Sequence, residues 1–468
     1  MGRMIDLKLT VEDDGPLYMQ LYRRIRGLIL SGDLQDGLKM PSKRLLCDQL
    51  SLSKTTVETA YGMLLEEGFL HSKPRSGLFV VNPEPIGKAA AQQDVSSSFK
   101  DVRSSDHAID FSLLAVDGDS FPVRLWRAAL AESLSLNANA VHQYGDPKGD
   151  LSLRVSLAQY LRTSREVSCE PEQIVIGTGI SYSVFLLSRI LEGITSIAME
   201  ENGIAQVKEI FDHHRFHVIP VPLEENELTV NELASRNIRA VYVTPSHRPS
   251  GSPMPYSTRQ QLLNWAYRLD GYIIEDDYDG EFRYAGKTIP SLQGLDQKGV
   301  VIYMGTFSKA FTPALRMNYM VLPVHLAEKL HSKGQILSHP SRPEQWAMQW
   351  FMERGHWYRH IRRMRHLYGK KREKLVQTVN AHFPNYVQIN GDSAGLHIEM
   401  RVKTDRTAEK LIELAAAEGV RVYGAQNERV NRSSGNPKIY LGFGGVNERD
   451  MERGVRLLKA AWRDILGE

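Results

Sequence analysis

A lysine and an acid near the ends of two apolar segments are the residues of this sequence best placed to do chemistry. Lys309 follows Thr306-Phe307-Ser308 after the apolar run 300–304, and Asp276 follows the run 272–274. Parallel strands deliver polar side chains at their carboxyl ends, so we expect both residues at one pocket. Desolvation and neighbouring positive charge lower the pKa of a lysine, which exposes a nucleophilic amine able to form an imine.

Pyridoxal 5'-phosphate (PLP) is the cofactor that such a pair would suit. Its aldehyde takes a lysine amine, and an acid on a neighbouring strand holds the pyridine nitrogen protonated. The alternative is that Lys309 is a surface lysine and that Asp276 and Asp277 lie in a solvated loop. Spacing alone leaves both interpretations open.

Longer motifs around these residues resemble the cofactor site of fold-type-I aminotransferases. They are Asp276-x-Tyr278, Thr306-x-Ser308-Lys309 and Arg316. The fuller strings at 244–247, 275–284 and 305–309 are similar to one branch in particular, the MocR regulators. In that branch an aminotransferase-like domain follows a GntR-type winged helix-turn-helix. The resemblance runs over nearly the whole chain.

The resemblance implies a role for each residue of the cofactor site. Lys309 would form the aldimine with PLP, Asp276 would pair with the pyridine nitrogen, and Tyr278 would reach the ring hydroxyl. A further ring-hydroxyl contact falls near His247. Free N–H groups at a helix start and nearby hydroxyls cradle a phosphate. The residues expected there are Gly179, Ile180, Ser181, Thr306, Ser308 and Arg316.

Three departures from the family pattern bear on the ligand. Ile204 stands where the family has a tyrosine beside the cofactor ring, and the loop 244–251 is one residue shorter than the family norm. Tyr440 stands in the last strand, where amino-acid transaminases carry an arginine that clamps the substrate carboxylate. Without that arginine an α-amino acid would lose a contact of about 2 kcal/mol or more.

Residues 16–81 have the pattern of a small DNA-binding unit. Apolar residues recur at helical spacing from Leu17 to Ile29, and Ser42 and Ser53 are candidate N-caps of two short helices. Those helices have the proportions of a helix-turn-helix, followed by strand-like pieces around the basic tip 73–76. On this pattern alone, DNA binding and a helical packing module are equally open.

Strings at 16–20, 40–44, 56–61 and 67–68 resemble the GntR winged helix and favour DNA binding. Helix-turn-helix proteins contact base edges from the first turns of the recognition helix. Lys54 stands where the family more often has arginine, so a two-pronged contact to guanine is in question. The residues expected at DNA are Ser42, Arg44, Ser53, Lys54, Thr55, Thr56, Arg75 and Gly77.

The chain divides into three expected segments: a winged helix-turn-helix at 1–81, a linker at 82–108 and an aminotransferase-like effector domain at 109–468. Strand-like runs at 174–176, 196–199, 218–221, 240–243, 272–274 and 300–303 alternate with helical stretches. This rhythm predicts an α/β domain with a mostly parallel sheet. A small α+β domain is expected from about residue 342, and the basic stretch 356–374 is predicted to be a packed helix with a solvated basic face.

Composition sets few further limits. A net charge of +3 over 468 residues is too small to indicate nucleic-acid binding by itself. Cys47 and Cys169 form neither a disulfide framework nor a metal spacing, so we expect packed thiols and no metal. The chain lacks a signal-peptide core and a run of about 18 apolar residues, so we expect a cytoplasmic protein with no membrane partner.

The leading hypothesis is a PLP-dependent transcriptional regulator that binds promoter DNA. PLP itself, or an amine or amino-acid-like effector, would act through the aldimine at Lys309, and the resemblance implies a homodimer. The alternatives are a working aminotransferase with an appended DNA-binding domain and a regulator with an empty cofactor site. The sequence does not decide the effector, the target operon, activation against repression, or any remaining transaminase activity.

Overall fold

The computed structural model describes residues 15–82, 108–200, 205–221, 223–224, 227–228, 230–246, 253–284, 289–332, 340–391, 394–424 and 436–466. The chain divides into two compact units, 1–103 and 104–468. Most of the expected linker 82–108, together with His247 and Ile204, lies outside the described residues. Within the described ranges, no helix combines the length and the apolar character needed to cross a membrane.

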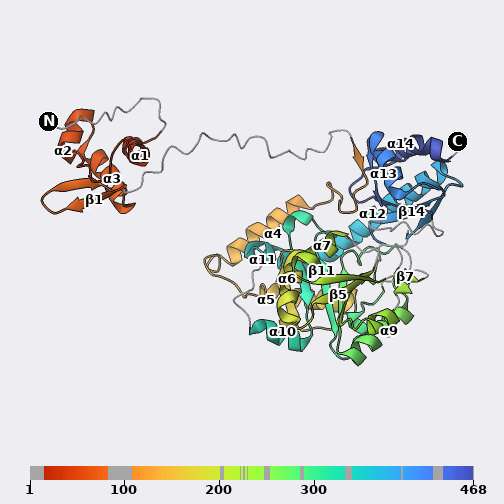
Figure 1. Cartoon of the computed structure of the whole chain (residues 1–468). Coiled ribbons are helices and arrows are strands. Elements are labelled where there is room, and N and C mark those ends of the chain that lie inside the picture. The colour runs from red at the N-terminus through yellow and green to blue at the C-terminus, as the bar shows by residue number, and fades with distance from the viewer. Residues whose placement is uncertain are drawn as a thin grey trace. The chain divides into compact units, whose positions relative to one another are not determined.

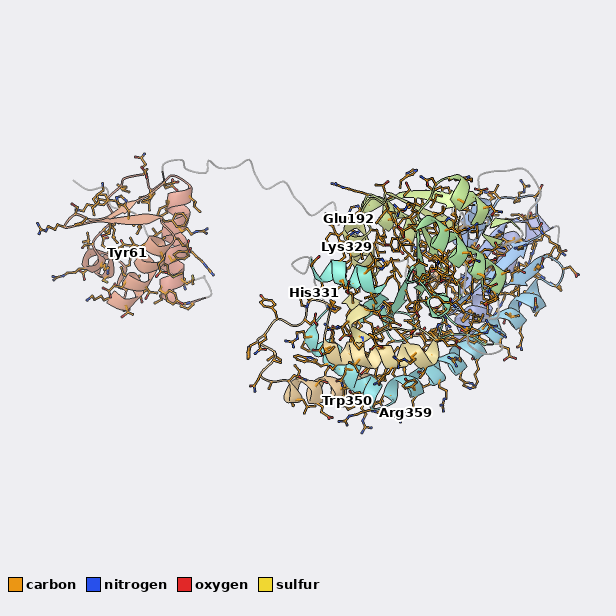
Figure 2. The ribbon with its side chains drawn as sticks, turned by 90° about the horizontal axis from the view of Figure 1, so that it is seen from below. Tyr61, Glu192, Lys329, His331, Trp350 and Arg359 are labelled. Atoms are coloured by element: carbon orange, nitrogen blue, oxygen red, sulfur yellow. The ribbon has the colours of Figure 1, made fainter. Side chains whose placement is uncertain are left out.

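The N-terminal unit is a three-helix bundle with a β-hairpin. Its helices are α1 (Leu17–Leu30), α2 (Lys43–Leu50) and α3 (Lys54–Glu66), and β1 (Leu70–Lys73) pairs antiparallel with β2 (Gly77–Val80). Both predicted N-caps are confirmed: the Ser42 hydroxyl accepts from the Leu45 N–H at 3.2 Å and the Ser53 hydroxyl from the Thr56 N–H at 3.1 Å. Figure 2 marks Tyr61 within this unit, where its ring is fully buried and its hydroxyl donates to the Pro41 carbonyl at 3.0 Å.

A seven-stranded sheet forms the centre of the large domain, in the order β4-β12-β11-β10-β9-β5-β6. All strands run parallel except β12, which pairs antiparallel with both neighbours. The six predicted strands are present, whereas β12 was not predicted. Their bounds are β4 (Ile174–Gly177), β5 (Ser196–Glu200), β6 (His217–Val221), β9 (Ala240–Val243), β10 (Tyr272–Asp277), β11 (Val301–Thr306) and β12 (Asn318–Val321).

Helices cover both faces of this sheet (Figure 1). On one face α6 (Ile180–Ile190), α7 (Ala205–His213) and α10 (Val324–His331) bury an apolar layer that includes Ile274 and Ile302. Figure 2 marks Lys329 of α10, whose Nζ lies 3.2 Å from an oxygen of Glu192 just beyond α6. The other helices of the large domain are α4 (Val123–Leu136), α5 (Leu151–Ser164), α8 (Val230–Ser235), α9 (Tyr256–Leu269) and α11 (Arg342–Glu353).

The basic stretch 356–374 is part of the long helix α12 (His356–His382). As predicted, its apolar residues pack inward: Trp357, Ile361 and Met364 are buried, whereas Arg359 and Arg362 are exposed. The small domain adds a four-stranded antiparallel sheet in the order β13-β14-β17-β16. Its elements are β13 (Val387–Asn390), β14 (His397–Val402), α13 (Ala408–Ala417), β15 (Val420–Arg421), β16 (Tyr423–Gly424), β17 (Lys438–Gly442) and α14 (Glu448–Leu466).

Residues 109–117, here called the arm, run from the start of the effector unit along the small domain. Strand β3 (Ile109–Asp110) pairs parallel with β15, and Figure 1 shows it in orange beside the blue C-terminal helices. The arm passes so close to β17 that a β-carbon at Gly442 would lie 2.1 Å from the Ser112 carbonyl oxygen. Only glycine permits this approach.

Asn318 of β12 fixes the turn that leads from β4 into α6. Its side-chain oxygen accepts from the Gly179 N–H at 2.8 Å, and its amide nitrogen donates to the Ser183 hydroxyl at 2.7 Å. Asn318 and Ser183 are buried, so neither group could exchange this partner for bulk water. Strand β12 thus holds the entrance of α6 in place.

We therefore expect Asn318→Ala to lower the free energy of unfolding by about 1–3 kcal/mol, because it leaves two polar groups without partners. Urea unfolding of the full chain measures this change. The control is Asn264→Ala, an exposed position on α9, for which we expect a change within about 0.5 kcal/mol. Equal stability of the two variants would contradict the role of Asn318.

Candidate cofactor and DNA sites

The residues expected at DNA lie on α2, α3 and the hairpin of the N-terminal unit. Arg44, Lys54 and Thr55 are exposed near the starts of the two helices. Ser53 and Thr56 are joined by a hydroxyl contact of 2.8 Å, so these two side chains also stabilise the start of α3. Arg75 in the hairpin turn has φ +59°, Gly77 at the start of β2 has φ +107°, and both are exposed.

The Lys309 amine is half-buried and donates to the Leu113 carbonyl of the arm at 2.7 Å. Burial lowers the pKa of this amine to about 8, while the negative charge of Asp279 opposes the shift. At pH 7 about a tenth of the amine is therefore in the neutral, nucleophilic form, far more than for an ordinary lysine. Sequence reasoning did not find the contact with Leu113, which lies 196 positions away.

Three consecutive acids at the end of β10 point alternately to the two faces of the sheet, because side chains alternate along a strand. Asp276 shares its face with Ile274 and is 9% exposed. Burial raises its pKa to about 7, and a hydrogen bond from the Tyr242 hydroxyl opposes this shift. A cationic group placed beside Asp276 would favour its ionised form. The solvated-loop alternative is therefore wrong for this residue.

Glu275 and Asp277 point to the other face and are held by the protein itself. Glu275 accepts from the N–H groups of Leu292 at 2.7 Å and Gln293 at 2.8 Å. Asp277 accepts from Arg165 at 2.6 Å and from the Tyr303 hydroxyl at 2.7 Å. These contacts anchor the end of β10 and leave Asp276 as the acid directed to the opposite side.

The residues expected around a phosphate converge at the start of α6. Gly179 has φ +125°, and a β-carbon there would lie 2.6 Å from a terminal guanidinium nitrogen of Arg316. Arg316 therefore lies directly against the turn before Ile180, the first residue of α6. Ser181 is exposed within the first turn, and its hydroxyl contacts the His214 ring at 3.2 Å.

Thr306 is the last residue of β11 and Ser308 follows it, and the Thr306 hydroxyl accepts from the Ser308 N–H at 3.1 Å. The first N–H groups of a helix have no partner within it, and a guanidinium beside them adds positive charge. The turn before α6 thus has the donors and charge that a phosphate requires. Tyr278 directly follows β10, and burial raises the pKa of its hydroxyl well above the usual value.

The described residues fit PLP by their chemistry. A half-buried amine follows β11, a buried acid lies at the end of the adjacent strand β10, and β12 separates β11 from β4. The turn between β4 and α6 meets Arg316 and forms a cationic cradle. Asn318 and Tyr242 support this arrangement and were missed by sequence reasoning. Asparagine and tyrosine at those positions carry no motif, so only the spatial pairing identifies them.

Comparison with known proteins gives the same two-part organisation. Residues 17–80 match the model for bacterial regulatory proteins of the gntR family, and residues 109–451 match aminotransferase class I and II. The chain is 39% identical to the uncharacterized HTH-type transcriptional regulator YdeL of Bacillus subtilis, over 96% of this chain and 97% of that protein. It is 30% identical to the probable rhizopine catabolism regulatory protein MocR of Rhizobium meliloti, over 97% and 96%.

Solved structures support the fold of the effector unit. The multiple substrate aminotransferase of Thermococcus profundus superposes with a TM-score of 0.69 at 24% identity, over 77% of this chain and 92% of that chain. The predicted α/β class with fold type I is therefore confirmed. Together with the full-length relatives, these matches show that the chain belongs to the MocR-type transcriptional regulators, in which a GntR helix-turn-helix precedes a PLP-binding aminotransferase class I and II domain.

Proposed function

We propose that this regulator binds promoter DNA through α2, α3 and the β1–β2 hairpin, and that PLP or an amine effector bound at Lys309 changes this binding. The observation that carries the proposal is the placement of Lys309 and Asp276 near the carboxyl ends of the adjacent strands β11 and β10. Burial moves the pKa of each toward neutrality, to about 8 and about 7. Its site of action would be the cytoplasm, where bacterial promoters are located.

PLP, when bound, supplies an aldehyde that condenses reversibly with primary amines. The protein's own residues would do the rest. Lys309 provides the amine, Asp276 holds a proton at the pyridine nitrogen, and Arg316 with the start of α6 binds the phosphate. An effector alters DNA binding only if it binds one domain arrangement more tightly than another, since equal affinity shifts no equilibrium.

We also propose a homodimer, and the support is a concentration of exposed apolar residues in one segment of the effector unit. Isolated exposed apolar residues are common, whereas a concentration of them marks an interaction surface. Among the described residues, most of the exposed large apolar side chains fall in the segment 114–155, which comprises the end of the arm, α4, the following loop and the start of α5. The most exposed are Leu114 at 60%, Val123 at 66%, Leu136 at 74%, Tyr144 at 102% and Leu151 at 51%.

Acylation of the cofactor-free protein by a neutral reagent should reveal the lowered pKa of the Lys309 amine. Because its pKa is about 8, labelling should rise with pH to a half-maximum near pH 8, whereas exposed lysines require about pH 10.4. Asp279→Asn removes the charge that favours the ammonium, so the midpoint should fall further. Mass spectrometry of the Lys309 peptide measures both midpoints.

The matched variant is Lys309→Ala, which should give no borohydride-reducible PLP adduct at this site. It should also bind promoter DNA with an affinity that PLP and amines leave unchanged. A Lys309 midpoint equal to that of exposed lysines would contradict the site. Sustained keto-acid production with ordinary amino donors would favour the aminotransferase alternative.

Lys54→Ala should weaken promoter binding and reduce its salt dependence, because an exposed lysine at the start of α3 suits a phosphate contact. The slope of log K against log salt should fall by about 0.9 for one lost phosphate contact. Fluorescence anisotropy at several salt concentrations measures it. Lys403→Ala, an exposed lysine of the small domain, is the control, and a slope unchanged in both variants would remove Lys54 from the interface.

Leu136→Asp combined with Tyr144→Asp should disrupt the homodimer, because two carboxylates would be buried at the interface without partners. Sedimentation velocity should show a dimer dissociation constant raised by at least about tenfold, equivalent to roughly 1.4 kcal/mol. Val324→Asp introduces the same charge at a site that is 58% exposed on α10 and should leave the dimer intact. A monomeric wild-type protein would refute the assembly.

A further inference from the structure

A row of four polar side chains crosses one face of the small sheet. Asn390, Glu399, Tyr440 and Tyr423 occupy paired positions on the four strands β13, β14, β17 and β16. Residues paired in this way in antiparallel strands have their side chains on the same face. Glu399 is completely buried and Tyr440 is 6% exposed.

The face that carries this polar row is the one covered by the arm. Gly442 lies two positions beyond Tyr440, on the same face, and there the Ser112 carbonyl approaches the strand. The Tyr423 hydroxyl donates to Asp110 of the arm at 2.8 Å. The next residue after Ser112 is Leu113, the acceptor of the Lys309 amine. The arm therefore connects the face that carries the polar row with the Lys309 amine.

Three donors of the neighbourhood are directed at Glu399. Its carboxylate accepts from the Tyr440 hydroxyl at 3.3 Å, from Arg401 Nε at 2.9 Å and from the Asn390 amide at 3.1 Å. A tyrosine has a single O–H, so a hydroxyl committed to a carboxylate offers only lone pairs to a third group. An incoming carboxylate would meet an acceptor at Tyr440, whereas an ammonium or hydroxyl would find a partner.

We infer that Tyr440, held by Glu399, selects amine effectors whose far end is a hydrogen-bond donor, such as an ammonium or a hydroxyl, and disfavours a carboxylate at that end. This inference rests on the proposed amine sensing at Lys309. The pair, and not Tyr440 alone, sets the preference. An arginine introduced at position 440 would be drawn into an ion pair with the buried Glu399 and would not clamp an effector carboxylate.

The test titrates the PLP-loaded full chain with linear primary amines of equal length that end in methyl, hydroxyl, ammonium or carboxylate. Dissociation constants are read from the shift of the cofactor absorbance band. We expect the hydroxyl- or ammonium-ended amine to bind at least about tenfold more tightly than the carboxylate-ended one, the factor typical of one matched against one mismatched polar contact. Tighter binding of the carboxylate-ended amine would overturn the inference.

Variants test whether the Tyr440–Glu399 pair, and not the other residues of the polar row, sets the preference between end groups. Tyr440→Phe should abolish the preference between end groups, whereas Tyr423→Phe, which loses the bond to Asp110, should retain it. Tyr440→Arg should remain a poor binder of the carboxylate-ended amine, and Tyr440→Arg with Glu399→Gln should bind it best. The melting temperature of each cofactor-free variant is the control. It shows whether a variant that loses the preference between end groups has simply been destabilised.

The experiment distinguishes a failure of amine sensing at Lys309 from a failure of the role given to the Tyr440–Glu399 pair. If no amine shifts the band and none changes promoter affinity, amine sensing at Lys309 is wrong and the inference falls with it. If amines bind and change promoter affinity without regard to the end group, or if Tyr423→Phe removes the preference as fully as Tyr440→Phe, then only the role of the Tyr440–Glu399 pair is refuted.

Discussion

The free-energy cost of burying charged side chains determines the arrangement of the effector domain's site more than any other constraint. Three acids stand side by side at the end of a central strand, and each must be paired, hydrogen-bonded or protonated. Asp277 has a buried arginine, Glu275 has two backbone N–H groups, and Asp276 has one tyrosine hydroxyl. Asp276 is thus the one that a cationic ring could still stabilise. A pyridinium bound there would offset the free-energy cost of the buried Asp276 carboxylate, which the protein alone compensates only in part.

The same reasoning connects the two halves of the site. A lysine amine and a carboxyl group that both titrate near neutrality are poorly stabilised by the protein in their charged forms. Such groups gain most from a ligand that replaces the missing partner. The site is therefore best understood as an incomplete set of electrostatic contacts that a small molecule completes, which suits a sensor as well as an enzyme.

Much of this organisation could be predicted because it follows from local patterns. The caps at Ser42 and Ser53, the six parallel strands and the inward face of α12 are periodicity and capping features that a short window of sequence contains. The supporting contacts could not be predicted in this way. Asn318, Arg165 and Leu113 reach partners more than 100 positions away, and β12 is a short strand whose antiparallel place between β4 and β11 has no local signal.

The arm has a consequence for how the chain is made. Ile109 pairs with Val420, and the arm packs on Gly442, so these two partners are synthesised more than 300 residues after it. Contacts of such sequence separation form late, and domains fold largely as units in the order of their synthesis. The winged helix needs only residues before 83 for its core. During synthesis on the ribosome, the DNA-binding unit can therefore fold before the arm can take its place beside Lys309.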